Sequence, residues 1–175
     1  MVECKGGGVA CPVSPQRALL VAFTAWTVLQ VVTAAAWSNP LTMRLILSPD
    51  FGQSQKLINV WTVWQPLPRI THQPPLLMML GFFFYAVLHV GAFIKLFPSI
   101  PGQRWKCKGM AFGAGILIFQ YGYFEFFGPF NQYHEPLPLI LYELLLQALM
   151  AFSEALVISW FLTPRLQSSP EGGCA

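Results

Sequence analysis

Charged side chains are scarce in this chain of 175 residues: only 10% are Asp, Glu, Lys or Arg, whereas 55% are hydrophobic. The mean hydropathy is +0.54, which leaves too little polar surface for a soluble domain. The net charge of +3 is small and the basic residues are scattered. The composition therefore argues against a nucleic-acid partner and predicts that the lipid bilayer surrounds the protein.

Cysteine pairs are also missing, because the four cysteines form no Cys-x-x-Cys motif. This absence excludes a membrane enzyme that makes disulfides, and the spacing of Cys4, Cys11 and Cys107 does not match a zinc site. A single copy has one histidine within its apolar segments, His89, so it lacks the second axial ligand of a b-type haem. The sequence therefore predicts no metal and no cofactor.

Four apolar segments are long enough to cross about 30 Å of hydrocarbon at about 1.5 Å per residue. Proline residues lie at or near their ends, where a helix is expected to begin or stop. The fold class predicted from these segments is an all-α integral membrane protein, a single bundle of four transmembrane helices. The predicted spans are about Ala18–Trp37, Leu76–Phe97, Met110–Phe127 and Leu137–Leu162.

The distribution of Lys and Arg predicts the orientation of this bundle. Seven basic residues lie on the side that holds residues 1–17, the second loop and residues 163–175, against three on the other side. Positive charge favours the cytoplasmic side, so we expect both termini in the cytoplasm of a plasma membrane or bacterial inner membrane. The alternative is a cleaved signal peptide ending near Ala34-Ala35-Ala36, which would leave three spans.

The first loop contains a segment with helical periodicity, about Ser54–Trp64. Leu57, Trp61 and Trp64 recur at i, i+4 and i+7, and polar residues occupy another face. This pattern predicts a short interfacial helix in the extracytoplasmic loop, with the tryptophans at the depth of the lipid headgroups.

A few polar residues lie inside the apolar segments, where each is costly to bury and needs a structural or functional reason. Glu143, Gln147 and Glu154 stand at i, i+4 and i+11, so they form one stripe that should face the other helices. By depth along the helices, His89 should lie level with Glu154, and their pairing would lower the cost of burying either one.

The remaining intramembrane polar residues extend this pattern across the bundle. Gln30, Gln120 and Gln147 fall near the midplane, and Glu125 and Glu143 fall toward the outer face, near His134 and Glu135. The alternative role for these groups is hydrogen bonding that only holds helices together. Our hypothetical ligand or proton path consists of His89, Gln120, Glu125, Glu143, Gln147 and Glu154.

Three functions fit these observations. The one the sequence favours is an accessory or scaffold subunit of a membrane assembly, with a membrane-protein partner or a second copy of the chain as well as the bilayer. The second is a carrier or binding protein for protons or for a small polar or amphipathic ligand. The third, an enzyme with Glu143 or His89 as acid-base, has the least support because no nucleophile or phosphate-binding loop accompanies them. Gly109-x-x-x-Gly113 predicts close helix packing within the bundle or, more weakly, between copies.

Overall fold

The computed structural model describes residues 13–48, 50, 52–64 and 75–167, and within these ranges the chain is helical with no strand. Three described helices are long and apolar enough to cross a membrane: Pro15–Trp37, Met79–Ser99 and Leu137–Gln167. The chain is therefore a helical membrane protein by the length and composition of these helices. Residues 1–12, which include Cys4 and Cys11, lie outside the described ranges, as does Cys174.

The first helix, α1 (Pro15–Trp37), begins where the sequence supplies a cap. Ser14 Oγ accepts a hydrogen bond from the backbone N–H of Arg17 at 3.4 Å, and Pro15 occupies the first helical position, where no N–H is needed. A short helix, α2 (Pro40–Leu47), follows with Asn39 as its cap. Both starts lie at positions that local capping chemistry favours, three residues before the predicted span in the case of α1.

The helices α4 (Pro75–Leu96) and α8 (Leu137–Gln167) match the second and fourth predicted segments. A 3-10 turn, η3 (Phe97–Ser99), extends α4. The helix α8 continues five residues beyond the predicted end at Leu162 and includes Pro164. Pro164 has no N–H to donate to the carbonyl of Trp160, the fourth residue before it, so only the last turn of the helix is affected.

The third predicted segment, Met110–Phe127, is helical but is not one long α-helix. The α-helix α5 (Trp105–Ile116) passes into π-helical η4 (Leu117–Gly122), then α6 (Tyr123–Glu125), π-helical η5 (Phe126–Phe130) and α7 (Asn131–Tyr133). Pro129 does not close the segment as predicted, because it lies within η5 and the backbone stays helical to Tyr133. The four-span count is consequently not established by helix length, and the described long apolar helices number three.

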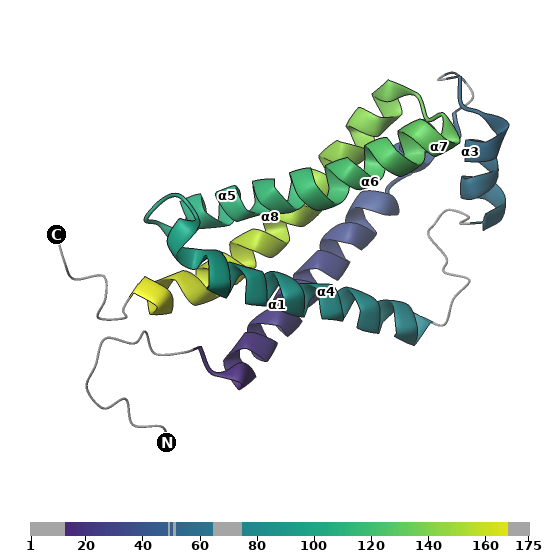
Figure 1. Cartoon of the computed structure of the whole chain (residues 1–175). Coiled ribbons are helices and arrows are strands. Elements are labelled where there is room, and N and C mark those ends of the chain that lie inside the picture. Colours follow the sequence, from purple (N-terminus) through teal and green to yellow (C-terminus); the bar gives the residue numbers. More distant parts are fainter. Residues whose placement is uncertain (1–12, 49, 51, 65–74, 168–175) are drawn as a thin grey trace, which may run out of the picture.

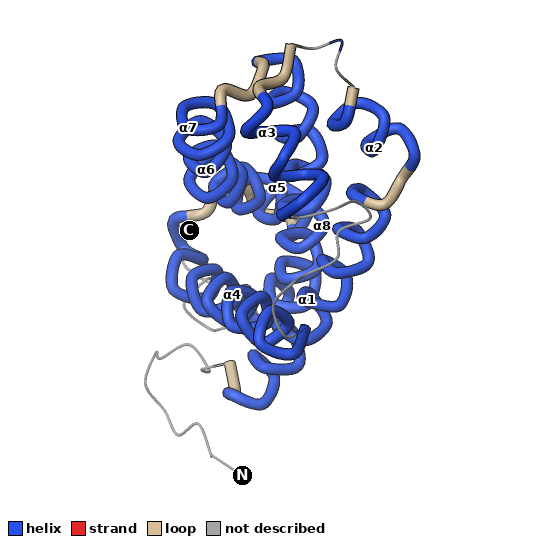
Figure 2. The backbone as a smooth tube through the Cα atoms, turned by 90° about the vertical axis from the view of Figure 1, so that its right-hand side faces the viewer, coloured by secondary structure: helices blue, strands red, loops and turns tan. Residues whose placement is uncertain are grey.

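The helices α1 and α8 and the segment from α5 to α7 run side by side, and α4 crosses α1 at an angle (Figure 1). The start of α1, the end of α8 and the connection between α4 and α5 lie at one end of the molecule, and α3, described below, and α7 lie at the other. The helix α8 packs extensively against α5 and α1, and α1 packs against α4. The view along the bundle places α4 apart from the α5–α7 segment (Figure 2). Extensive helix contacts therefore surround α8, but they do not join α4 to α5.

The helix α5 approaches α8 closely at two glycines, Gly109 and Gly113. Their four-residue spacing predicted such packing within the bundle. A Cβ placed on Gly109 would lie 3.1 Å from the Cα of Leu156, and one on Gly113 would lie 2.6 Å from Cδ1 of Phe152. Because glycine has no side chain, residues of α8 can pack directly against the backbone of α5 at these two positions. The small-residue face is thus occupied inside the chain.

The described stretch before α4 is helical, and its place in an outer interface stays a prediction. It forms α3 (Gln55–Asn59) and π-helical η2 (Val60–Trp64), and Ser54 caps α3 by accepting the N–H of Leu57. Leu57 is buried in a cluster with residues of α1, α2 and α8. The side chains of Trp61 and Trp64 lie outside the described part of the chain, so their position at the headgroups stays a prediction.

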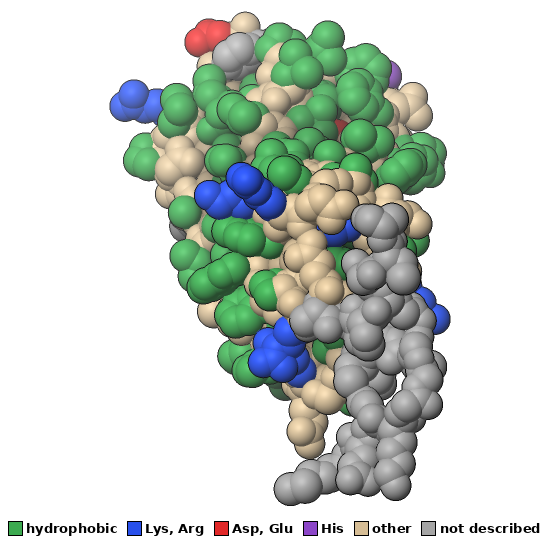
Figure 3. All heavy atoms as spheres, turned by 90° about the vertical axis from the view of Figure 1, so that its left-hand side faces the viewer, with side chains coloured by type: hydrophobic (Ala, Val, Ile, Leu, Met, Phe, Trp, Pro, Cys, Tyr) green, Lys and Arg blue, Asp and Glu red, His purple; other side chains and the backbone are tan. Residues whose placement is uncertain are grey.

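Large apolar side chains cover the outside of the bundle, as lipid contact requires. Phe119 is 82% exposed, and Leu20, Val31 and Leu77 are each more than half exposed. Figure 3 views the end that holds the start of α1 and the end of α8 and shows Lys and Arg side chains set among hydrophobic ones. This distribution is that of a bundle whose sides contact lipid and whose end carries positive charge.

Candidate functional site

The polar stripe of α8 faces the interior, as its spacing predicted. Glu143 is 2% exposed, Gln147 5% and Glu154 fully buried. Gln147 bonds to Glu125 of α6 and Glu154 contacts His89 of α4, so the stripe faces these two segments. The burial of these three polar residues on one helix sets the location of the candidate site.

His89 and Glu154 form the pair that their depths predicted, here named the histidine pair. His89 Nδ1 lies 2.9 Å from Oε1 of Glu154, and His89 Nε2 lies 3.0 Å from Oε1 of Gln120. Three helical segments, α4, η4 and α8, thus contribute one polar side chain each. The histidine is positioned through both of its ring nitrogens.

This arrangement fixes how many protons the histidine pair holds. Because the Gln120 oxygen accepts, Nε2 of His89 carries a hydrogen and donates it. The contact between Nδ1 and the Glu154 oxygen then needs one further proton, on the imidazole or on the carboxyl group. In either form the pair is neutral as a whole, which avoids the cost of an isolated charge in the membrane.

One side of His89 borders a cavity of about 460 Å³ between α4 and α5, here called the α4–α5 groove. Most of its lining residues are apolar, Ala92, Leu96 and Phe119 among them, and the polar ones are His89, Gln120 and Ser99. His89 is the only ionisable side chain among the described residues that line the groove. An apolar cavity with a few converging polar groups is the usual form of a small-molecule site.

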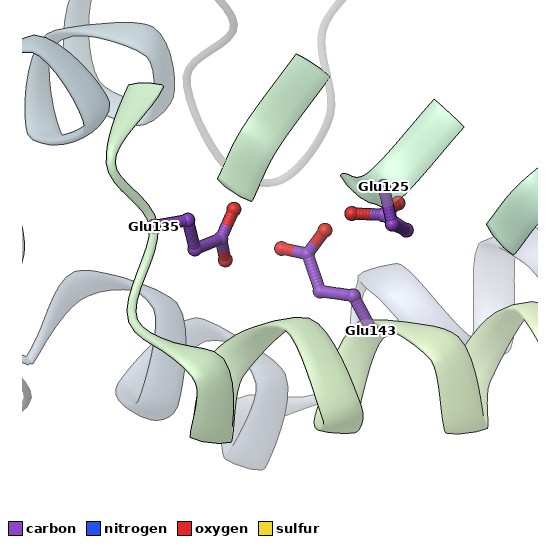
Figure 4. Close-up of side chains that lie close together, drawn as sticks. All are labelled: Glu125, Glu135 and Glu143. Atoms are coloured by element: carbon purple, nitrogen blue, oxygen red, sulfur yellow. The ribbon is translucent and has the colours of Figure 1, made fainter. Parts of the chain in front are cut away.

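A second polar group, the carboxylate cluster, consists of Glu125, Glu135 and Glu143. One carboxylate oxygen from each lies within 4.8 Å of the others, and all three side chains are buried. Glu143 projects from α8, Glu125 from α6 and Glu135 from the connection before α8, with the carboxyl groups turned toward one another (Figure 4). The amide nitrogen of Gln147 donates a hydrogen bond to Glu125 Oε1.

The chain direction around Glu135 explains its entry into this cluster. His134 has a left-handed backbone with φ of 54°, which ends α7, and the N–H of Glu135 donates to the carbonyl of Pro129 at 3.0 Å. This turn places the carboxyl group of Glu135 inside the bundle end at 2% exposure. Burial raises the pKa of Glu135 to about 7, the charge of Glu125 acts in the same direction, and a hydrogen bond with Glu143 opposes them.

The carboxylate cluster has two chemical capabilities. Three negative charges this close cannot all persist in a buried site, so the cluster can hold protons near neutral pH. The same oxygen donors are of the type that a hard divalent cation prefers. The sequence predicted no metal; the structure brings together three residues whose donor atoms are of that type.

Sequence reasoning located most of these residues but missed two. The sequence places Glu135 in the third loop near Glu125 and Glu143 but does not include it in the predicted path, because nothing in its local sequence signals the left-handed turn at His134. Tyr121 lies in the same region, half-buried and within electrostatic range of Glu154; it was treated as part of an apolar run. Gln30, expected at the midplane with Gln120 and Gln147, makes no described contact with either.

No family model, curated protein or solved structure matches this chain. The fold and the site define a class on their own: a helical membrane protein with a buried polar interior. Function must accordingly be argued from the groove, the histidine pair and the carboxylate cluster.

Proposed function

We propose that this protein is a carrier or binding protein for a small amphipathic ligand held in the α4–α5 groove, and that binding is linked to protons. The observation that carries the proposal is the position of His89. One ring nitrogen contacts the buried Glu154 carboxyl, and the side chain also lines the apolar groove. A ligand in the groove would therefore meet a group that shares a proton with a carboxyl.

The chemical class of the ligand follows from the lining of the groove. Its apolar walls suit a hydrocarbon portion, and the amide group of Gln120 suits a hydroxyl or carbonyl oxygen. Exposed Leu96 and Phe119 border the groove, and such side chains would contact lipid in a membrane. The ligand would thus enter sideways from the bilayer.

The same proposal includes the topology. The continuous helical segment from Trp105 to Tyr133 would form a fourth crossing beside α8, despite its π-helical parts. The end that carries Arg17, Lys95 and Lys106 would face the cytoplasm, with both termini, in a plasma or bacterial inner membrane. The helix α3 would then lie at the outer interface.

The subunit function favoured by the sequence is the second candidate. Exposed apolar side chains on every long helix would suit a membrane-protein partner as well as lipid. However, α8 of the same chain packs against Gly109 and Gly113, so this small-residue motif is not available for contact with a second copy. An enzyme that uses Glu143 is less well supported, because Glu143 belongs to the carboxylate cluster and does not line the groove.

Photolabelling in nanodiscs tests the ligand proposal. The probe is a long-chain alcohol with a diazirine in its chain, and labelled peptides are located by mass spectrometry. The test variant is Gly115→Leu, because Gly115 lines the groove and an added Cβ meets nothing within 4 Å. Gly91→Leu is the matched control on exposed α4 surface, where an added Cβ also meets nothing within 4 Å.

The expected result is labelling concentrated on the groove residues of α4 and α5, reduced at least fivefold in Gly115→Leu and unchanged in Gly91→Leu. Equal labelling of all lipid-facing helices, unaffected by Gly115→Leu, would contradict the proposal. A stoichiometric protein that co-purifies and shields the groove from the probe would favour the subunit function instead.

A further inference from the structure

The carboxylate cluster collects negative charge in a buried part of the bundle. Glu125 is 1% exposed, and Glu135 and Glu143 are each 2% exposed. Their carboxyl groups come from α6, from the connection before α8 and from α8 itself, and they turn toward one another (Figure 4). Like charges this close are unfavourable away from water, so the cluster needs either protons or a cation to balance them.

The spacing of the carboxylate oxygens suits a single cation. One oxygen from each residue of the cluster lies within 4.8 Å of the other two. Even at the corners of an equilateral triangle of that side, three atoms lie only about 2.8 Å from its centre, and calcium binds oxygen at about 2.3–2.6 Å. Shifts of a few tenths of an ångström are therefore enough to bring all three residues into contact with one ion.

An amide group at the same place supplies a second, independent indication of a ligand. The side-chain nitrogen of Gln147 donates a hydrogen bond to Glu125 Oε1, which places the amide at the cluster. Gln147 is 5% exposed, and its Oε1 accepts no hydrogen bond from the described part of the chain. A buried acceptor without a donor is costly. A half-turn about the last side-chain bond exchanges the two amide atoms and directs this oxygen at the cluster.

The number and kind of these oxygens favour Ca²⁺ over Mg²⁺. Three carboxylates and one amide offer seven oxygen atoms, and Ca²⁺ takes about six to eight. Mg²⁺ binds at about 2.0–2.1 Å in a strict octahedron and usually keeps several of its waters. A set of side chains that is almost fully buried offers an ion protein oxygens in place of water.

We propose that the carboxylate cluster and the neighbouring amide form a binding site for one calcium ion, with the ligands Glu125, Glu135, Glu143 and Gln147. Two carboxylates balance the charge of the ion, and a proton kept on the third leaves the site neutral. The inference goes beyond the proposed function and does not depend on it, because none of these residues lines the α4–α5 groove.

A bound ion would tie together segments that are separate in the chain. It would join α6, the connection before α8 and α8 at the end of the bundle that holds α7. The helix α3 is attached to the same end, because Ser54 Oγ donates to the carbonyl of Tyr133 at 2.7 Å and Lys56 Nζ donates to that of Gln132 at 2.8 Å. Calcium should therefore stabilise this end of the folded protein.

Calcium binding to the full chain in detergent, first freed of metal with EDTA, tests the proposal. The probe is radioactive Ca²⁺ in equilibrium dialysis at pH 8, with thermal unfolding recorded in parallel. We expect one ion per chain, a dissociation constant below about 1 mM and a raised melting temperature. Binding of Mg²⁺, measured by competition, should be at least tenfold weaker.

Four variants locate the ion. Glu143→Gln and Glu135→Gln each remove one carboxylate and keep the shape of the side chain, so each should weaken calcium binding at least tenfold. Because Glu135 lies before α8, its replacement leaves that helix intact if Glu143→Gln fails to fold. Gln147→Met removes the amide oxygen and should weaken binding at least threefold. Asp50→Asn, which removes an exposed carboxylate outside the cluster, should match the parent protein.

Several results would overturn the proposal. A lack of saturable calcium binding in the parent protein would do so, as would binding that Glu143→Gln and Glu135→Gln both leave unchanged, since the ion would then lie elsewhere. Equal affinity for Mg²⁺ would overturn the choice of calcium. Unchanged calcium binding in Gln147→Met would overturn the role of the amide oxygen.

Discussion

Lys108 Nζ lies 2.6 Å from the backbone carbonyl oxygen of Ile100, across the connection that joins α4 to α5. The same ammonium group donates to the carbonyl of Phe97 at 2.9 Å and lies over the Phe97 ring. These carbonyls belong to the end of the α4–η3 segment, where intrahelical partners run out. Lys108 of α5 thus caps the C-terminal end of the neighbouring α4–η3 segment with a buried positive charge.

We expect Lys108→Met to destabilise the protein by about 1.5–3 kcal/mol, since it removes hydrogen bonds from a charged donor to buried carbonyls. The free energy of unfolding in a stepwise SDS titration measures the effect. Lys95→Met, which removes an exposed ammonium from the same helix end, should change it by less than about 0.5 kcal/mol. Equal effects in the two variants would show that the carbonyl contacts contribute little.

Replacement of a glycine on α5 by alanine should change the stability of the protein in different directions at Gly113 and Gly115. Gly113→Ala places a Cβ 2.6 Å from Phe152, which we expect to destabilise the protein by about 1–3 kcal/mol. Gly115→Ala meets nothing within 4 Å and should be neutral or stabilising by up to about 1 kcal/mol, because alanine favours the helix. Thermal unfolding of both variants checks this, and a stable Gly113→Ala would contradict the close helix contact.

The hydroxyl groups of Thr42 and Tyr142 lie 2.7 Å apart and join α2 to α8. Thr42 also donates to the carbonyl of Ala36. Tyr142→Phe should destabilise the protein by about 0.5–1.5 kcal/mol. A double-mutant cycle with Thr42→Val tests the contact: additive effects would mean that the two hydroxyls do not interact.

The free energy of unfolding should fall as the pH rises toward the pKa of Glu135 in the folded protein. Its pKa is about 7 in the folded protein against an ordinary value of 4.5, so the folded state binds the proton more tightly than the unfolded state. This contribution is fully present below about 4.5 and is lost as pH rises through about 7. Melting temperatures between pH 5 and pH 8 should therefore decrease, and Glu135→Gln should flatten that decrease. A profile unchanged in the variant would assign the dependence to other groups.

The sequence predicted the helical membrane class because long apolar runs leave few alternatives, and α1, α4 and α8 lie within a few residues of the predicted spans, except that α8 runs on to Gln167. Pairing of His89 with Glu154 was predictable because both depth and the cost of burial demanded it. The π-helical parts were not, since hydropathy does not depend on which backbone hydrogen bonds form. The sequence placed Glu125 and Glu143 at the same depth, but it did not predict that Glu135 joins them, because that depends on the left-handed turn at His134.

The two π-helical stretches change what a deletion in the segment from Trp105 to Tyr133 would do. Backbone hydrogen bonds in a π-helix join residues five apart, so a π-helical turn holds more residues than an α-helical turn. Ile118 in η4 is 63% exposed and its side chain contributes little buried contact. Loss of Ile118 would therefore let η4 take up α-helical hydrogen bonding, with Glu125 still facing Glu143 and with Gly109 and Gly113 still against α8. Deletion of one residue from an α-helical part of the chain would instead rotate everything beyond it by about 100°.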